Sequence, residues 1–583
     1  EQDQVEVERL RLRFGHFAAE QHVQEGKLFC SCPAADGSPD PGFSRRLHAT
    51  ASEMGQVDAA AAAENVRDFG YHQGDGNCLV EADEEPPRGP NPEAVEVALQ
   101  VAGLLGAQPL EEIHFMRKVV VDGSNTTGFQ RTALVATGGR LDYDGGSVDI
   151  EQLCLEEDSC RRGEGEDEFL LDRLGVPLLE ISTAPQLHSP EAVQAAARTM
   201  GLLLRACRVR RGLGTIRQDL NVSIPQGVRV ELKGFQDLGT MPQVVEREME
   251  RQAILATVEA CEPGPAIEIT ALLKKSREAW GCRLPGWASL LGSPESPADH
   301  PRLGRELADH ARRAGVAGLL QSDELPAHGV SAEEAAVIAT ELDCRKVDAF
   351  ILVFEKKTLA KAALARACNR ARQGGVPHEV RRVLAEGGSR YLRPMPGAAR
   401  MYPETDISPL RLAGNAVELP PTLAERIAVL PLGAQQAGQL VRARLDARFH
   451  ALVAAGGPPK TVARLLLHQL PELRKARLPA PSEAVLGELL AAVADGKLAK
   501  EGVEDALAAL ARGEALPEQA ASGAGELDAF IEQLLAERKD FVQQRGMEAV
   551  GPLMGTVMGE FRGRVDGALV SERLRVKLGE FLG

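Results

Sequence analysis

The 583-residue sequence lacks the features that would place the protein in a membrane or outside the cell. No apolar run approaches the roughly 18 residues that a membrane-spanning helix needs. Residues 1–13 lack the basic segment and apolar stretch of a secretory signal. Of the ten cysteines only Cys30 and Cys32 are closely spaced, so we expect reduced thiols and no disulfide framework. These absences predict a cytoplasmic protein that does not bind a membrane.

Several sequence signatures of large enzyme classes are also absent. The sequence contains no Gly-x-x-x-x-Gly-Lys-Ser/Thr loop, so a bound nucleotide would not be held by a P-loop. It contains no Gly-x-Ser-x-Gly elbow and no His-Glu-x-x-His helix. Cys30 and Cys32, with Cys78 or a histidine, are candidate zinc ligands, but two thiols two positions apart are only half a site, and unliganded thiols are the alternative interpretation.

Basic residues do not dominate the sequence, which carries 67 lysines and arginines against 84 acidic residues and a net charge of −17. Because phosphate binding depends on basic side chains that release counterions, any surface for nucleic acid must be local. The best candidate lies between residues 441 and 477. Its basic residues include Arg442, Arg444, Arg448, Arg474, Lys475 and Arg477. From spacing alone this segment is either a phosphate-contacting helical surface or a solvated helix face.

The length predicts three to five folded units. Short β-rich runs alternate with glycine-rich turns up to about residue 170, and a helix capped by Ser189 follows, so the part up to about 265 is predicted to be α+β. Prolines then punctuate the sequence before helical patterns at 303–315 and 332–342, which indicates a separate inserted domain. After about residue 423 the sequence is predicted to be all-α.

Two groups of polar residues interrupt the predicted strands. The first is the acidic cluster Glu156, Glu157 and Asp158, with Glu180 at the end of a later apolar run. Carboxylates among apolar strand residues suit Mg²⁺, which prefers oxygen ligands, although an acidic surface turn has the same composition.

The second polar group comprises Arg217, Asp219, Asn221 and, on the next strand, Lys233. Strand alternation places Arg217, Asp219 and Asn221 on one face of the sheet. Such a face is either a catalytic floor or an ordinary solvent-facing surface.

Taken together, several motifs resemble the GatB/GatE family of tRNA-dependent amidotransferase subunits, and within it the archaeal-type GatE branch. They include KLFCSCP at 27–33, a segment at 116–132, CLEED at 154–158, LDRLGVPLLEI at 171–181 and RGLGTIRQDLNVS at 211–223. The resemblance extends from about Lys27 to the end of the sequence.

The resemblance implies a multidomain fold. An α+β amidotransferase cradle would occupy 1–265 and 397–425, interrupted at 266–396 by an α+β domain similar to the extra domain of bacterial-type aspartyl-tRNA synthetases. An all-α helical domain at 426–500 and a YqeY-like tail domain at 501–583 would follow.

The resemblance also implies an activity, the conversion of Glu-tRNA(Gln) into Gln-tRNA(Gln). ATP would phosphorylate the γ-carboxylate with the help of Mg²⁺, and ammonia would displace the phosphate. Ammonia would come from a separate asparaginase-like protein, GatD, with two copies of each chain in the assembly. We find no nucleophile motif of a glutaminase or asparaginase in this sequence.

The motif match assigns roles to individual residues. Glu157, Glu180 and His22 would bind Mg²⁺, with Glu156 and Asp158 beside them. Arg217, Asp219, Asn221 and Lys233 would line the catalytic cradle, and the basic residues at 441–477 would contact tRNA.

The sequence departs from the family around His22. Family members carry a Gly-Leu-Glu-Ile-His-Gln strand shortly before Lys-Leu-Phe-Cys, and its glutamate and histidine belong to the metal site. Here Glu20 and His22 preserve the pair, with Ala18 in place of the glycine, or Gly15 is the family glycine and the pair is lost. In the second case the protein would be a catalytically impaired paralogue that still binds tRNA.

Overall fold

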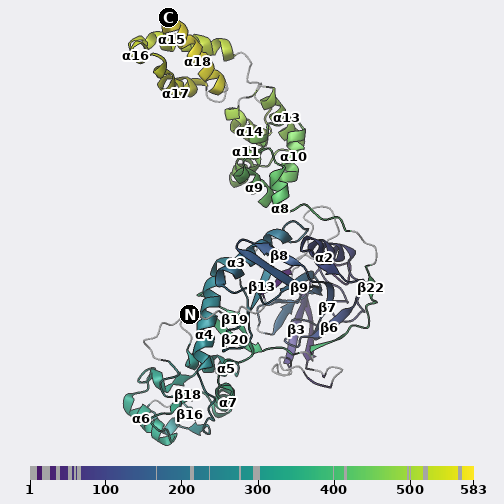
Figure 1. The fold of residues 1–583 in the computed structure, drawn as a ribbon, viewed down its shortest axis with the longest axis vertical. Coiled ribbons are helices and arrows are strands. Elements are labelled where there is room, and N and C mark those ends of the chain that lie inside the picture. The colour runs from purple at the N-terminus through teal and green to yellow at the C-terminus, as the bar shows by residue number, and fades with distance from the viewer. Residues whose placement is uncertain are drawn as a thin grey trace. The chain divides into compact units, whose positions relative to one another are not determined.

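The chain forms two compact units, Glu1–Pro420 and Pro421–Gly583, in a computed structural model (Figure 1). The structure describes residues 10–15, 26–33, 40–49, 51, 55–57, 61, 67–165, 167–210, 216–235, 237–274, 278–292, 302–397, 400–412, 417–495, 498, 500–515, 523–561 and 567–582. Within these ranges, no helix is both long enough and apolar enough to span a bilayer.

A 12-stranded sheet forms the centre of the first unit, in the order β20-β19-β14-β13-β1-β12-β9-β7-β6-β21, with β4 beside β7 and β8 beside β9. The strands are β1 (Leu10–Gly15), β4 (Gln108–Pro109), β6 (Phe115–Val119), β7 (Phe129–Thr137), β8 (Arg140–Tyr143), β9 (Gly146–Glu157), β12 (Pro177–Thr183), β13 (Ile216–Val222), β14 (Val230–Lys233), β19 (Glu379–Val383), β20 (Ser389–Pro394) and β21 (Met401–Pro403). Neighbouring strands are antiparallel except for β14 and β19, which are parallel.

Three helices, α2 (Pro92–Leu104), α3 (Pro190–Leu204) and α4 (Met241–Ala256), pack on one face of this sheet. Because side chains alternate along a strand, apolar residues such as Leu153 and Leu155 of β9 enter the core under these helices. Helix α3 begins as predicted, since the Ser189 hydroxyl accepts a hydrogen bond from the amide of Ala192 at 3.1 Å. The opposite face of the sheet is left for polar side chains.

Two smaller sheets complete this part of the first unit. One contains β2 (Asp40–Leu47), β3 (Arg67–Gln73), β10 (Arg161–Arg162) and β11 (Glu168–Leu170) in the order β10-β11-β3-β2. Its core contains the aromatic rings of Phe69, Tyr71 and Phe169. The other pairs β5 (Glu112–Ile113) with β22 (Leu410–Arg411).

The predicted insertion has a sheet and a core of its own. Its strands are β15 (Ile267–Glu268), β16 (Trp280–Leu284), β17 (Leu320–Gln321) and β18 (Ala349–Val353), and its helices are α5 (Leu303–Arg312), α6 (Ala332–Glu341) and α7 (Lys357–Gln373). Both helices predicted from the sequence pattern, α5 and α6, are present. The chain rejoins the large sheet at β19, so the return to the cradle comes earlier than residue 396.

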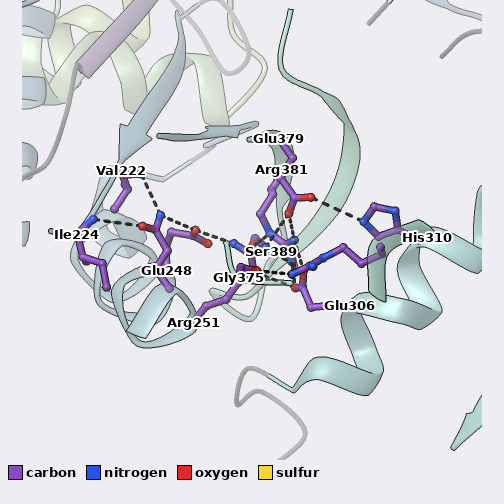
Figure 2. Close-up of polar contacts among 12 residues, drawn as sticks. Val222, Ile224, Glu248, Arg251, Glu306, His310, Gly375, Glu379, Arg381 and Ser389 are labelled. Carbon is purple, nitrogen blue, oxygen red and sulfur yellow. Dashed lines mark hydrogen bonds and ion pairs between the residues drawn. The ribbon is translucent and has the colours of Figure 1, made fainter. Parts of the chain in front are cut away.

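A buried network of ion pairs joins the insertion to the cradle. Arg251 of α4 donates to both carboxylate oxygens of Glu306 on α5, each at 2.8 Å, and to Glu379 of β19 at 2.7 Å (Figure 2). Arg381 of β19 also contacts Glu306, at 2.9 Å. Burial alone would raise the pKa of Glu306, but Arg251 and Arg381 lower it well below its ordinary value. Charges from three elements are therefore compensated inside the protein.

The second unit is all-α, as predicted. Its helices are α8 (Leu423–Ala428), α9 (Ala434–Arg442), α10 (Asp446–Ala454), α11 (Pro459–Arg464), α12 (Leu470–Lys475), α13 (Glu483–Ala494), α14 (Val503–Ala511), α15 (Gly523–Glu537), α16 (Lys539–Arg545), α17 (Val550–Phe561) and α18 (Gly567–Leu582). Helices α15 to α18 share one hydrophobic core, whereas α14 packs against α13. The first helical group thus extends past the predicted boundary at residue 500.

Candidate active site and flanking sites

A cavity of about 520 Å³ opens on the polar face of the large sheet. Strands β6, β7, β9, β12, β13 and β14 supply its floor, and the segment that follows β20 supplies a wall. Its charged lining residues are Glu112, His114, Lys118, Glu156, Glu180, Arg229, Glu231, Lys233, Arg393 and Arg400. A cavity with acidic and basic groups from so many strands has the composition of a site for a charged substrate.

Two carboxylates meet on the cavity floor. Lys118 of β6 forms ion pairs with Glu156 of β9 and with Glu180 of β12, the latter at 3.7 Å. Glu156 also accepts hydrogen bonds from the Thr132 hydroxyl at 2.8 Å and from the Gln130 amide at 3.2 Å. All three charged side chains are nearly inaccessible to solvent. One buried ammonium group therefore joins two buried carboxylates from different strands.

The second polar group also meets at the cavity. Lys233 of β14 donates to Asp219 of β13 at 2.8 Å and lies 3.1 Å from Glu231. Asn221 lines the same cavity, while Leu220, between Asp219 and Asn221 in the sequence, lies in the core. The predicted alternation is seen from Asp219 to Asn221, and Asn221 contributes to a cavity floor instead of an open surface.

Glu157 and Asp158 do not line this cavity. Glu157 follows Glu156 on β9 and therefore points the other way, where it accepts a hydrogen bond from the Arg131 amide at 2.8 Å. Burial raises the pKa of Glu157, and Arg131 opposes this change. Asp158 is bound by the guanidinium of Arg173, at 2.7 Å. Glu156 takes the position beside Glu180 that the sequence motif assigned to Glu157.

The side chains of three residues with expected roles lie outside the described part of the chain. Arg217 lies on β13 opposite Arg13, but its side chain is outside the described part. His22 and Glu20 lie in the range 16–25, which is also outside the described residues. Their roles remain predictions.

Lys118, Arg393 and Arg400 line the cavity but were not among the residues predicted from the sequence. Lys118 lies within the family motif at 116–132, and alternation with Met116 would have placed it on the polar face. Arg393 and Arg400 lie in a proline-rich segment, residues 393–403, on either side of the predicted end of the insertion at residue 396. Their position depends on how the chain returns from the insertion.

A separate group of thiols lies near the start of the first unit. The sulfur atoms of Cys30, Cys32 and Cys78 and a carboxylate oxygen of Glu81 all lie within 4.8 Å of one another. Burial and the neighbouring Glu81 raise the pKa of Cys30, and burial raises the pKa of Cys78 to about 11. Three sulfurs and one carboxylate match the number and type of ligands of a tetrahedral zinc site. Glu81 is also 3.3 Å from the ammonium group of Lys27, which competes with a metal ion for it.

The predicted basic patch lies on the first helical group of the second unit. Arg448 pairs with Glu483 at 2.6 Å, and Lys475 pairs with Glu472 at 2.7 Å. Arg474 and Arg477 are exposed, and no ion pair involves either of them within the described residues. These two arginines keep the most freedom to contact a phosphate.

Comparison with known proteins gives matches of this chain to family models and to individual relatives. A family model described as the GatB/GatE catalytic domain matches residues 19–418, and one described as a GatB domain matches residues 447–578. The GatE-type chain of the glutamyl-tRNA(Gln) amidotransferase from Methanospirillum hungatei is 39% identical over 616 residues, which cover 99% of both chains. The corresponding chain from Thermococcus gammatolerans is 40% identical over 607 residues, or 95% of this chain and 96% of the relative.

The resemblance inferred from the motifs is thereby confirmed. The catalytic-domain match alone covers more than half of the chain and includes every strand of the cavity floor. The chain belongs to the GatB/GatE family.

Proposed function

We propose that this protein is a transamidating subunit that uses ATP to convert Glu-tRNA(Gln) into Gln-tRNA(Gln). The relatives are named as GatE-type chains of glutamyl-tRNA(Gln) amidotransferases, and the similarity extends over nearly their full length. The observation that carries the proposal is the buried cluster of Glu156, Glu180 and Lys118 on the floor of the family's catalytic domain. Lys233 supplies a further positive charge in the same cavity.

The proposed reaction has two steps. A carboxylate is a poor electrophile, so an oxygen of the glutamyl γ-carboxylate first attacks the terminal phosphorus of ATP, and ADP leaves. Ammonia then attacks the carbonyl carbon of the acyl phosphate, a proton is lost from the nitrogen, and inorganic phosphate leaves. Lys118 and Lys233 provide fixed positive charges for phosphoryl oxygens in both steps. Thr132 and Gln130 orient Glu156 for its role.

A divalent cation fits the cavity floor. Glu156 and Glu180 offer only oxygen atoms as ligands, and both are buried beside one ammonium group on the cavity floor. When bound, Mg²⁺ would screen the negative charge of the ATP phosphates. We therefore assign Glu156 and Glu180 as the metal ligands. Glu157 contacts Arg131 and is not assigned as a ligand.

The nitrogen donor is proposed to be a second protein. An asparaginase-like partner, GatD, would release ammonia, and two copies of each chain would form the assembly. A permanent interface that guides ammonia would bury on the order of 2,000 Å² or more. The two proteins should therefore remain together through purification at moderate salt.

The test uses the full-length chain, Glu-tRNA(Gln) and ATP, with free ammonium as the nitrogen donor. We expect ATP-dependent formation of Gln-tRNA(Gln), measured by releasing and separating the labelled amino acids. With asparagine or glutamine in place of ammonium, the chain alone should be inactive until the partner is added. Activity of the chain alone with either amide would contradict the need for a partner.

The altered sequence near His22 favours one second candidate, a tRNA-binding paralogue with impaired catalysis. The same assay separates the two candidates when tRNA binding is measured in parallel by filter retention. Tight binding of Glu-tRNA(Gln) with no amidation by ammonium, even with the partner present, would support the paralogue and contradict the transamidase.

A further inference from the structure

Arg393 differs from the other basic residues of the cavity because no ion pair or side-chain hydrogen bond involves it within the described residues. Lys118 is paired with two carboxylates, and Lys233 is paired with Asp219 and Glu231. His114 lies 2.9 Å from Glu112, and the Nε of Arg400 donates to the carbonyl of Val119 at 2.9 Å.

The acidic residues of the cavity are already compensated. Glu156 and Glu180 share Lys118, Glu231 contacts Lys233, and Glu112 contacts His114 and Arg411. A half-buried guanidinium group that has lost part of its hydration normally gains an anionic partner. Since the described residues of the cavity offer Arg393 no such partner, its charge is available for a substrate.

The backbone holds Arg393 firmly in this position. It lies on β20, which pairs with β19 in antiparallel register, Val380 opposite Arg393. Strand β19 in turn pairs with β14, which carries Lys233. Arg393 therefore extends the row of cations on the cavity floor toward the wall formed by the segment after β20, away from Glu156 and Glu180 on β9 and β12.

We infer that Arg393 binds the phosphates of ATP in this cavity, an inference that rests on the proposed function. A planar guanidinium group donates two parallel hydrogen bonds to phosphate oxygens, which a single ammonium group does not. Among the proposed substrates, ATP concentrates the most negative charge in one group. The side chains of Met395 and Pro396 line the same wall and offer an apolar surface on which an adenine base can pack.

The experiment measures binding of a non-hydrolysable ATP analogue with Mg²⁺ by isothermal titration calorimetry. We compare the wild type with Arg393→Gln, Arg393→Lys and a control, Arg390→Gln. Arg390 lies on the same strand but is exposed and does not line the cavity. Hydrogen bonds to a charged group are worth about 1.5–3 kcal/mol, so Arg393→Gln should weaken binding roughly 10- to 100-fold. Arg393→Lys should fall between Arg393→Gln and the wild type.

The amidation assay with ammonium supplies an independent comparison. Arg393→Gln should raise the KM for ATP and leave the KM for Glu-tRNA(Gln) close to that of Arg390→Gln. A rise in the KM for Glu-tRNA(Gln) alone would show that Arg393 binds the tRNA instead, and overturn the inference. Unchanged analogue binding would overturn it as well. Failure of the wild type itself to amidate would count against the proposed function and not against Arg393 specifically.

Discussion

At the residue scale, the neighbouring residues Glu156 and Glu157 of β9 point in opposite directions, and only Glu156 lines the cavity. This difference can be tested by substitution. Replacing Glu156 or Glu180 by glutamine should lower ATP-dependent amidation by about 10²- to 10³-fold, because the loss of a carboxylate ligand would weaken Mg²⁺ binding and leave the phosphate charge unscreened. The rates are measured with ammonium as donor at saturating Mg²⁺. Circular dichroism checks that each variant is folded.

Glu157→Gln is the matched control for these variants. Glu157 faces Arg131 and does not line the cavity, so amidation should stay near the wild-type rate. If Glu157→Gln were inactive while Glu156→Gln was active, the metal assignment would return to Glu157.

At the scale of elements, the ion pairs between α4, α5 and β19 hold the insertion to the cradle (Figure 2). Glu306→Gln should destabilise this region by about 3–5 kcal/mol, because it leaves Arg251 and Arg381 buried with too little negative charge. Both tryptophans of the chain, Trp280 and Trp287, are buried in the insertion, so their fluorescence during urea unfolding reports this region. The exposed Glu341→Gln on α6 is the control and should change the stability by less than about 0.5 kcal/mol.

The pH dependence of unfolding gives the same network a second test. Despite burial, the arginines hold the pKa of Glu306 well below its ordinary value of 4.5. Such a carboxylate stabilises the folded state fully above its unfolded pKa, and the contribution is lost as the pH falls through the lower, folded pKa. Wild-type stability should therefore fall in acid, below about pH 4.5, more steeply than that of Glu306→Gln. Parallel pH profiles would contradict this account.

The loops that carry Cys30, Cys32 and Cys78 bring three sulfur atoms close to a carboxylate oxygen of Glu81, and their capacity to bind zinc can be tested. We expect the purified protein to contain zinc in a stoichiometric amount, measured by plasma mass spectrometry, and to give thiolate-to-metal absorption with Co²⁺. Cys32→Ser should lose both signals, whereas Cys344→Ser in the insertion should keep them. Absence of both signals in the wild type would mean that the thiols bind no metal ion and that Glu81 forms an ion pair with Lys27 instead of binding a metal.

At the scale of the whole molecule, a net charge of −17 must be reconciled with binding of an RNA polyanion. Charge reversal at Arg474 and Arg477 should weaken tRNA binding and lower the slope of log affinity against log salt by roughly one unit per lost phosphate contact. Binding of the ATP analogue should not change, because the catalytic cavity lies in the other unit. Reversal of Arg512, which is paired with Glu514, is the control. An unchanged salt slope would assign the patch to a solvated helix face.

The sequence by itself determined the family, the order of an α+β unit and an all-α unit, and several of the polar residues that line the cavity. These features depend on local patterns: alternation along β13, the Ser189 cap of α3, and motifs that the family shares. Local patterns survive in a linear sequence because the residues involved are close neighbours in it.

Tertiary structure alone decided which of the adjacent carboxylates, Glu156 or Glu157, faces the cavity. A shift of the strand register by one residue would move every side chain of the strand to the other face of the sheet. It also brought Glu81 to three cysteines and Arg393 to the catalytic cavity, although Arg393 follows an insertion of more than a hundred residues. Contacts of this kind join residues that are far apart in the sequence, and they are fixed only when the strands pair and the insertion returns to the sheet.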